Sequence, residues 1–263
     1  MTLTDNMTES DRSGRPDSWR PNRTMRPGPK TREQLRRLGR VWEQGEHILI
    51  SGSTGSGKTA LARHIIELRA KRNGHLLVFC MKPLEDETII RDYKGFTRWK
   101  HWKDKPASWE KKVLVWPDVR KAKGDKDEIL RMQRDVFTEA FNGINAAGHY
   151  TVQVDEGLYT VHPSFLGMSG DLGMAHAIGR SGRLTMVTLT QRPSHLPLIL
   201  YGSASHAFVG RTREASDQKR LAELGAKEGA KALAGTISEQ GRHDFLWIPV
   251  APDWPAERVN LTE

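Results

Sequence analysis

Short apolar segments recur along the chain and alternate with longer stretches in which apolar and polar residues are mixed. Apolar runs of this length, bounded by turn-forming residues, are typical of buried strands. We interpret as strands the segments at residues 46–51, 75–80, 112–117, 149–154, 184–190 and 206–210. Residues 244–250 are expected to add an edge strand.

Helical spacing of apolar residues fills several of the intervals between these strands. Leu61, Ile65 and Leu68 share one face of a predicted helix that ends before Asn73 and Gly74. A second helix, over residues 129–147, has an apolar face made of Val136, Phe137, Ala140, Phe141 and Ile144. Short strands that alternate with helices predict an α/β fold with a mainly parallel sheet and helices on both faces. Ligands of such sheets bind beyond the carboxyl ends of the strands.

A glycine-rich sequence, GSTGSGKT, follows the first predicted strand and opens the first predicted helix, as the pattern G-x-x-x-x-G-K-[ST] requires. The glycines let the backbone curl so that its amides face phosphate oxygens, and the positive helix end adds to the attraction. Lys58 is expected to reach the β- and γ-phosphates of ATP, and the Thr59 hydroxyl to bind Mg²⁺. A loop that merely turns the chain is the structural alternative. The residues expected to bind nucleotide are Gly52, Ser53, Thr54, Gly55, Ser56, Gly57, Lys58 and Thr59.

Two carboxylates, Asp155 and Glu156, follow the predicted strand at residues 149–154. An aspartate in this place can hold Mg²⁺, directly or through water, and the adjacent glutamate can polarise a water for attack on the γ-phosphate. An acidic loop after a strand is the alternative, and Thr151 and Gln153 make this strand less apolar than a central parallel strand usually is. A glutamate beside the metal aspartate favours hydrolysis over the phosphoryl transfer of a kinase. At least one predicted strand, at residues 112–117, intervenes between the two motifs, which is consistent with their strands being separated in the sheet.

The segment GRSGRLTMVTLTQRPS is similar to a segment of FtsK/HerA-type DNA-pumping ATPases, in which an arginine and a glycine precede a strand that ends in Thr-Gln-Arg-Pro. With GSTGSGKT and TVQVDEG in the same order, the resemblance covers roughly residues 45–225. It implies a RecA-like P-loop NTPase core and a catalytic role for Gln191 as a sensor of the γ-phosphate or the attacking water. A glutamine amide suits that role, because it donates and accepts hydrogen bonds without changing charge.

The resemblance also implies that Arg180, which precedes the Gln191 strand, reaches the nucleotide of a neighbouring subunit. Such an arginine finger can raise the rate by about 10³–10⁵. A solvated or salt-bridged surface arginine is the alternative, and Arg183, Arg211 and Arg213 are rival candidates. The sequence departs from the family in two places. Of the Asp-Pro-Lys that commonly follows the second strand it keeps only Lys82, and the glycine after Arg180, Gly182, comes one residue early.

Basic residues are concentrated in two regions of a chain whose net charge is +9. Residues 1–40 contain ten Lys and Arg against five Asp and Glu, and residues 91–126 contain twelve against five. Residues 1–30 lack apolar periodicity and are expected to form a disordered basic tail. The region at about 91–126 interleaves cations with Tyr93, Phe96, Trp99, Trp102 and Trp109. Such a mixture favours DNA binding, although each tryptophan can equally pack the insert onto the core.

These observations predict a P-loop ATPase domain over residues 31–263, with the basic, tryptophan-rich segment as an insert. The function we expect is Mg²⁺-dependent ATP hydrolysis by an oligomeric motor core that acts on DNA, and the resemblance implies a homohexamer. An ATP-gated switch protein with slow hydrolysis, or less readily a kinase, is the alternative. The single cysteine, Cys80, and the lack of an apolar run of about 20 residues predict a cytoplasmic protein without a membrane segment.

Overall fold

A computed structural model of the chain describes residues 27–70, 74–82, 86–101, 111–224, 230–249 and 256–262. The predicted tail lies outside the described residues, apart from its last four positions. Helix α1 (Pro29–Val41) begins within those four positions, at a proline in the first helical turn. Residues 102–110 of the basic insert, with Trp102 and Trp109, also lie outside the described part. The division into a tail and one ATPase domain stays a prediction.

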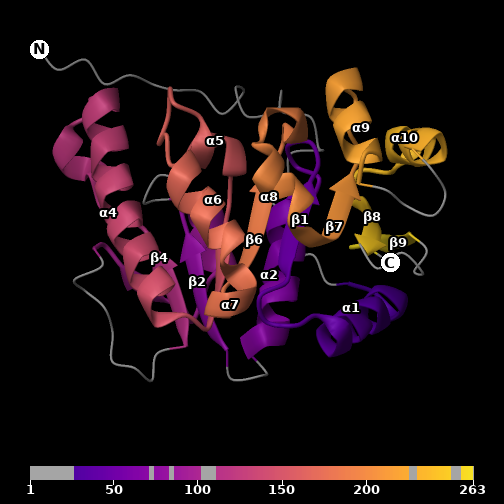
Figure 1. The fold of residues 1–263 in the computed structure, drawn as a ribbon, viewed down its shortest axis with the longest axis horizontal. Coiled ribbons are helices and arrows are strands. Elements are labelled where there is room, and N and C mark those ends of the chain that lie inside the picture. The colour runs from indigo at the N-terminus through magenta and orange to yellow at the C-terminus, as the bar shows by residue number, and fades with distance from the viewer. Residues whose placement is uncertain are drawn as a thin grey trace, which may run out of the picture.

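The described strands form one nine-stranded sheet in the order β3-β4-β2-β5-β6-β1-β7-β8-β9 (Figure 1). The pairs from β3 to β7 are parallel, whereas β8 and β9 are antiparallel to their neighbours. The strands span β1 His47–Ser51, β2 His75–Phe79, β3 Thr97–Trp99, β4 Lys112–Val115, β5 Tyr150–Val154, β6 Thr185–Thr190, β7 Ala204–Gly210, β8 Asp244–Pro249 and β9 Glu257–Asn260.

The sequence predicted seven of these strands and missed the strands at the two edges of the sheet, β3 and β9. The expectation that residues 244–250 form an edge strand is wrong, because β9 pairs along the outer side of β8. The alternating pattern of Glu257–Asn260 buries only Val259, so that a four-residue segment of mostly polar residues gave no strand signal. β3 is still shorter, with three residues.

Two apolar clusters lie on opposite faces of the sheet, which confirms the predicted α/β architecture of a RecA-like P-loop NTPase. One cluster packs the sheet against α4, α6 and α8, and the other packs it against α1, α2 and α3 (Figure 1). The helices are α1, α2 Lys58–Ala70, α3 Glu87–Asp92, α4 Lys126–Ala147, α5 Gly157–Val161, α6 Ser169–Ala177, α7 Gly179–Gly182, α8 Leu198–Gly202, α9 Ala215–Ala222 and α10 Ala230–Glu239, with short 3₁₀ turns at η3 Val119–Ala122 and η4 Pro193–His195.

Strand β5 is less apolar than its neighbours, and one of its buried polar side chains has a hydrogen-bond partner on another element. Gln153 is fully buried, and its amide nitrogen donates to the hydroxyl of Tyr93, 2.5 Å away. Tyr93 itself is only 3% exposed. The contact avoids the cost of roughly 1–3 kcal/mol that an unpaired buried amide nitrogen would carry, whereas the Gln153 side-chain oxygen has no hydrogen-bond partner among the described residues.

The amino-terminal edge of β1 and β6 is closed by buried histidines. The amide of Met186 donates to His47 Nδ1 (3.0 Å), and His47 Nε2 lies 3.0 Å from the carbonyl oxygen of His176. The two imidazole rings are 4.5 Å apart. Gly179 fits against this pair only because it has no side chain, since a Cβ there would lie 2.2 Å from His47 Cε1.

No helix among the described residues combines the length and the apolar character that crossing a bilayer demands.

Candidate functional site

The carboxyl ends of β5, β6 and β1 lie side by side and define one edge of the sheet. Strand β6 lies between the phosphate-loop strand β1 and the acidic strand β5, which agrees with the expectation that another strand separates the two motifs. A pocket of about 380 Å³ opens at this edge. It is lined by Thr54, Gly55, Lys58, Thr59, Met81, Lys82, Asp155, Glu156, Tyr159 and Gln191.

The loop between β1 and α2 is curled as the motif predicts. Gly55 and Gly57 have φ of +74° and +97°, a region that residues with a side chain rarely adopt. The Lys58 ammonium donates to the carbonyl oxygens of Gly52 (2.8 Å) and Ser53 (3.0 Å), and burial lowers the pKa of Lys58 despite the nearby carboxylates. A buried ammonium inside a loop of amides, at the start of α2, is a suitable site for a phosphate group.

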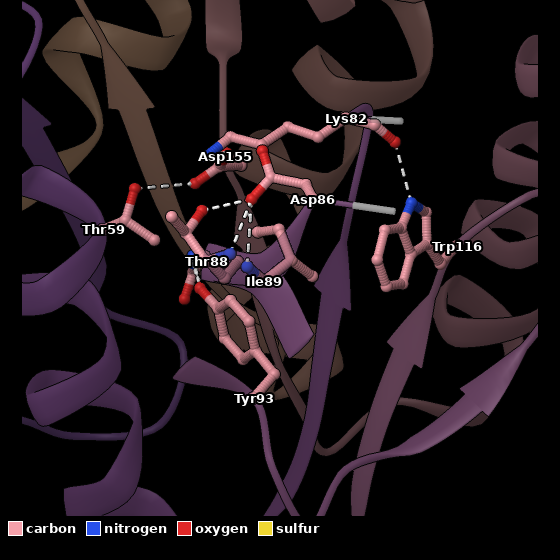
Figure 2. Close-up of polar contacts among 9 residues, drawn as sticks. Thr59, Lys82, Asp86, Thr88, Ile89, Tyr93, Trp116 and Asp155 are labelled. Atoms are coloured by element: carbon pink, nitrogen blue, oxygen red, sulfur yellow. Dashed lines mark hydrogen bonds and ion pairs between the residues drawn. The ribbon is translucent and has the colours of Figure 1, made fainter. Parts of the chain in front are cut away.

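Asp155 and Thr59 meet at the base of the pocket, as Figure 2 shows. The Thr59 hydroxyl donates to Asp155 Oδ1 (3.2 Å), and the Asp155 side chain is only 9% exposed. Burial raises the pKa of this carboxyl, while Lys82 and the bond from Thr59 act in the opposite direction. A hydroxyl and a buried carboxylate are hard oxygen donors of the kind that Mg²⁺ prefers, so these two residues fit the metal site that the sequence predicts.

Lys82 is the third group at this carboxylate, with its Nζ 4.0 Å from Asp155 Oδ2. The backbone of Lys82 is held by Trp116, whose indole nitrogen donates to the Lys82 carbonyl oxygen (2.7 Å). Asp86 lies beside the lysine and caps α3, accepting from the amides of Thr88 and Ile89 (Figure 2). The lysine that the sequence retains from the family pattern is therefore a lining residue of the pocket.

Glu156 and Gln191 follow the adjacent strands β5 and β6, and hydrogen bonds connect them to each other and to the phosphate loop. The Glu156 carboxylate accepts from the amide of Leu158 (3.3 Å) and from the backbone of Gln191. Burial raises the pKa of Glu156. The Gln191 side-chain oxygen accepts from the Thr54 hydroxyl (2.7 Å), which leaves its amide nitrogen available to a ligand.

Arg180 is not part of this pocket. It lies in α7, before the amino end of β6, whereas Gln191 follows the carboxyl end of the same strand. The Arg180 side chain is exposed, makes no hydrogen bond or ion pair within the described part of the chain, and lines a separate pocket of about 340 Å³ with His47 and His176. Arg183 lies beside it, at the same edge. An arginine at this edge cannot act on the nucleotide site of its own chain.

The other two rival arginines follow β7, at the phosphate-loop edge of the sheet. Arg211 and Arg213 are exposed, and the carbonyl oxygen of Arg211 accepts from the amide of Ser53 (3.4 Å). These two arginines therefore lie at the edge of the sheet that carries the phosphate loop of the same chain, whereas Arg180 and Arg183 lie at the opposite edge.

Arg192, for which the sequence suggested no role, connects the Gln191 strand to α9. Its Nε lies 3.0 Å from Oδ2 of Asp217, as an ion pair without the alignment of a hydrogen bond. Asp217 is fully buried, and its other oxygen accepts from the amide (2.9 Å) and the hydroxyl (2.5 Å) of Ser194. The residues directly after Gln191 are thus fixed by a buried carboxylate.

The aromatic residues of the basic insert that the structure describes pack inward. Tyr93 and Trp99 are 3% and 2% exposed, and the guanidinium of Arg98 lies over the Trp116 ring at 4.9 Å. Phe96 is half-buried and packs against the apolar cluster that contains Tyr93. The buried rings of Tyr93 and Trp99 are not available to stack on bases. Among the lysines of this insert, Lys100 has a side chain that is 49% exposed and lies 3.6 Å from Asp118 Oδ2. Lys103 and Lys105 lie outside the described residues.

Sequence reasoning missed the pocket residues Tyr159 and Met81. The Tyr159 hydroxyl donates to Gln133 Oε1 (2.9 Å), and the Gln133 amide donates to the Met81 carbonyl oxygen (3.2 Å). This chain of bonds fixes the pocket wall opposite the phosphate loop. A tyrosine three residues after Glu156 carries no motif of its own, so that only its place beside the acidic strand reveals it.

Comparison with known proteins finds similarity to this chain at the level of the fold. A family model described as the Sigma-54 interaction domain matches residues 25–95, which is less than half of the chain. Comparison with curated protein sequences finds no match. The similarity therefore comes mainly from solved structures.

Three solved structures illustrate that similarity. The genome packaging NTPase B204 from Sulfolobus turreted icosahedral virus 2 is 17% identical, with a TM-score of 0.56 over 82% of this chain and 96% of that one. VirB4 of Thermoanaerobacter pseudethanolicus is 10% identical, with a TM-score of 0.59 over 81% and 88%. The pCW3 conjugation coupling protein TcpA is 15% identical, with a TM-score of 0.51 over 86% and 62%. The resemblance to FtsK/HerA-type ATPases is thereby confirmed for the fold.

Proposed function

We propose that this protein is a Mg²⁺-dependent ATPase, the core of an oligomeric motor that acts on DNA. One observation carries the proposal: five residues from three sequence-distant motifs, Lys58, Thr59, Asp155, Glu156 and Gln191, converge on one pocket. B204, whose fold is similar, has been solved with ATP-gammaS, AMPPCP and AMP, which supports a nucleotide as the ligand of the equivalent loop.

Each residue of the pocket has a role that follows from its position. The loop amides and Lys58 bind the phosphates, and Thr59 and Asp155 hold Mg²⁺, which neutralises charge on the phosphate oxygens when it is bound. Glu156 orients a water and accepts its proton, because it is the second carboxylate at the edge and is not bonded to Thr59. The free amide nitrogen of Gln191 donates a hydrogen bond to an oxygen of the terminal phosphate or to the attacking water.

The arginine finger in this proposal comes from a neighbouring subunit. Arg180 supports that assignment, because it is an exposed cation at the opposite end of β6 from its own pocket. A ring in which this edge of one subunit faces the pocket of the next would complete the site. The oligomer, with six copies as the expected number, is therefore part of the proposal.

DNA as the partner is supported by charge and by the nature of the similar structures. Residues 91–126 contain twelve Lys and Arg against five Asp and Glu. B204 is named as a genome packaging NTPase and TcpA as a conjugation coupling protein. Because the rings of Tyr93 and Trp99 are buried, the contact that we propose is made by the lysines of the insert with the phosphate backbone, and its affinity should fall steeply with salt.

The decisive experiment measures ATP hydrolysis with and without double-stranded DNA for the wild type, Glu156→Gln and Gln191→Ala. Both variants should bind ATP normally and lose at least about 10²-fold in turnover, because Glu156→Gln removes the proposed base and Gln191→Ala removes a positioned hydrogen-bond donor. Glu139→Gln, the same change at an exposed position of α4, is the matched control and should hydrolyse ATP like the wild type. Full turnover in Glu156→Gln would contradict the proposed mechanism.

The DNA partner is tested by charge reversal at Lys100, Lys103 and Lys105. We expect weaker DNA binding and a smaller salt dependence at unchanged ATP affinity. Unchanged DNA binding would exclude the insert as the contact surface, and slow ATP turnover that DNA does not affect would favour the switch protein.

A further inference from the structure

The turn between α10 and β8, residues 241–243, lies against the phosphate loop. Because β8 runs antiparallel to β7 and Phe245 pairs with Gly210, the start of β8 lies at the same edge of the sheet as the end of β7. His243 Nδ1 is 3.2 Å from the carbonyl oxygen of Ser56. Arg242 Nη2 would lie 3.4 Å from a Cβ placed on Gly55, so its guanidinium is in contact distance of the loop. No motif in the sequence points to these residues.

This turn is held in place by the nearly buried carboxylate of Asp244. Its two oxygens accept from the amide of Gly241 (3.0 Å) and from the side chain of Asn260 (2.6 Å), which joins the turn to β9. The amide of Leu261 donates to the carbonyl oxygen of His243 (3.2 Å). The backbone that carries Arg242 is therefore fixed by the last two strands.

The Arg242 side chain itself is exposed and makes no hydrogen bond or ion pair with any described residue. A long cation that has no partner in the described part of the chain, on a backbone anchored at both ends beside a phosphate loop, is available to a ligand of that loop. Arg192 differs in this respect, because it is paired with Asp217.

The order of the strands shows which end of a nucleotide Arg242 faces. Glu156 and Gln191 follow β5 and β6, on one side of β1, whereas the turn with Arg242 precedes β8, on the other side of β1. In the proposed function the terminal phosphate lies beside Glu156 and Gln191, because hydrolysis takes place there. A triphosphate held along the loop must then direct its ribose and base towards the β7 and β8 side.

We propose that Arg242, positioned by His243 and Asp244, binds the base of the nucleotide by stacking its guanidinium on the aromatic ring. Planar guanidinium groups stack on aromatic faces better than the point charge of a lysine does. This inference rests on the proposed function, since it requires a nucleoside triphosphate in the loop, and it adds a residue that distinguishes a nucleotide from a bare polyphosphate.

The test compares the binding of ATP and of inorganic tripolyphosphate, by calorimetry, to the wild type, Arg242→Ala, Arg242→Lys and Arg258→Ala. Arg242→Ala should weaken ATP binding about tenfold, the effect expected of one cation–π contact, and leave tripolyphosphate binding within about twofold. Arg242→Lys should recover only part of the loss. Arg258, an exposed arginine of the neighbouring strand β9, is the matched control and should change neither affinity.

Equal losses for ATP and tripolyphosphate would overturn the inference, because the guanidinium would then contact phosphate. An unchanged ATP affinity in Arg242→Ala would overturn it as well, as would a wild type that binds tripolyphosphate as tightly as ATP. Since binding and not turnover is measured, a chain that binds ATP without hydrolysing it contradicts the proposed ATPase and leaves this comparison valid.

Discussion

The buried carboxylate of Asp217 offers a quantitative test of how the Gln191 segment is held. Asp217→Asn keeps the shape of the side chain and an oxygen for Ser194 but removes the negative charge. Two charge-assisted hydrogen bonds from Ser194, worth roughly 1.5–3 kcal/mol each, become neutral bonds worth roughly 0.5–1.5 kcal/mol. The ion pair with Arg192, whose side chain is 40% exposed, adds at most about 1 kcal/mol because solvent screens it.

The free energy of unfolding should therefore fall by about 2–4 kcal/mol, measured by urea denaturation with linear extrapolation. Asp135→Asn, at an exposed position of α4, is the matched control and should cause no measurable change. The variant Arg192→Gln and the double variant complete a double-mutant cycle.

The cycle separates the ion pair from the bonds to Ser194. We expect a coupling energy between Arg192 and Asp217 of about 0.5–1 kcal/mol that decreases at high salt. A loss below about 0.5 kcal/mol in Asp217→Asn would refute the reasoning, because a fully buried charge with three partners would then contribute no more than a surface residue.

Two further predictions concern the histidine edge of the sheet. Gly179→Ala should destabilise the fold by more than about 3 kcal/mol in the same urea assay, because the new Cβ would overlap the buried His47 ring. The control Gly170→Ala, whose Cβ would meet no atom within 4 Å, should stabilise α6 by up to about 1 kcal/mol. Equal effects of the two substitutions on the free energy of unfolding would contradict this packing. Burial lowers the pKa of His47 and His176, so the unfolded chain binds more protons at low pH. The stability that these histidines contribute is present above the unfolded pKa near 6.5 and should fall by up to about 1.4 kcal/mol per pH unit for each histidine below it. His176→Gln should reduce that slope, and a parallel pH profile of the variant and the wild type would show that the histidine does not cause it.

The sequence predicted well what local chemistry determines. The phosphate loop is encoded by its glycines and by Lys58, since left-handed backbone and an ammonium are required wherever such a loop forms. Seven of the nine described strands and the main helices follow from apolar periodicity, because burial on both faces of the sheet requires continuous apolar runs. Asp155, Glu156 and Gln191 could also be placed, since the ends of parallel strands share one edge.

Contacts between distant segments could not be read from the sequence in the same way. The partners of Gln153 and Arg192 come from elements 60 and 25 positions away, and no local pattern connects them. The edge strand β9 was missed because an edge strand buries few side chains. Since β9 pairs with β8, the prediction that β8 lies at the edge was wrong.

The sequence by itself determined the class of site, a phosphate loop with two carboxylates and a glutamine, because those residue types and spacings carry the chemistry. Only the tertiary structure decided which groups surround it. The antiparallel return of β8 brings Arg242 and His243 to the loop, and the length of β6 separates Arg180 from Gln191. The physical reason is that strand order and direction are set by packing of the whole sheet, which sums many weak contacts, whereas a motif is set by the few atoms that touch the ligand.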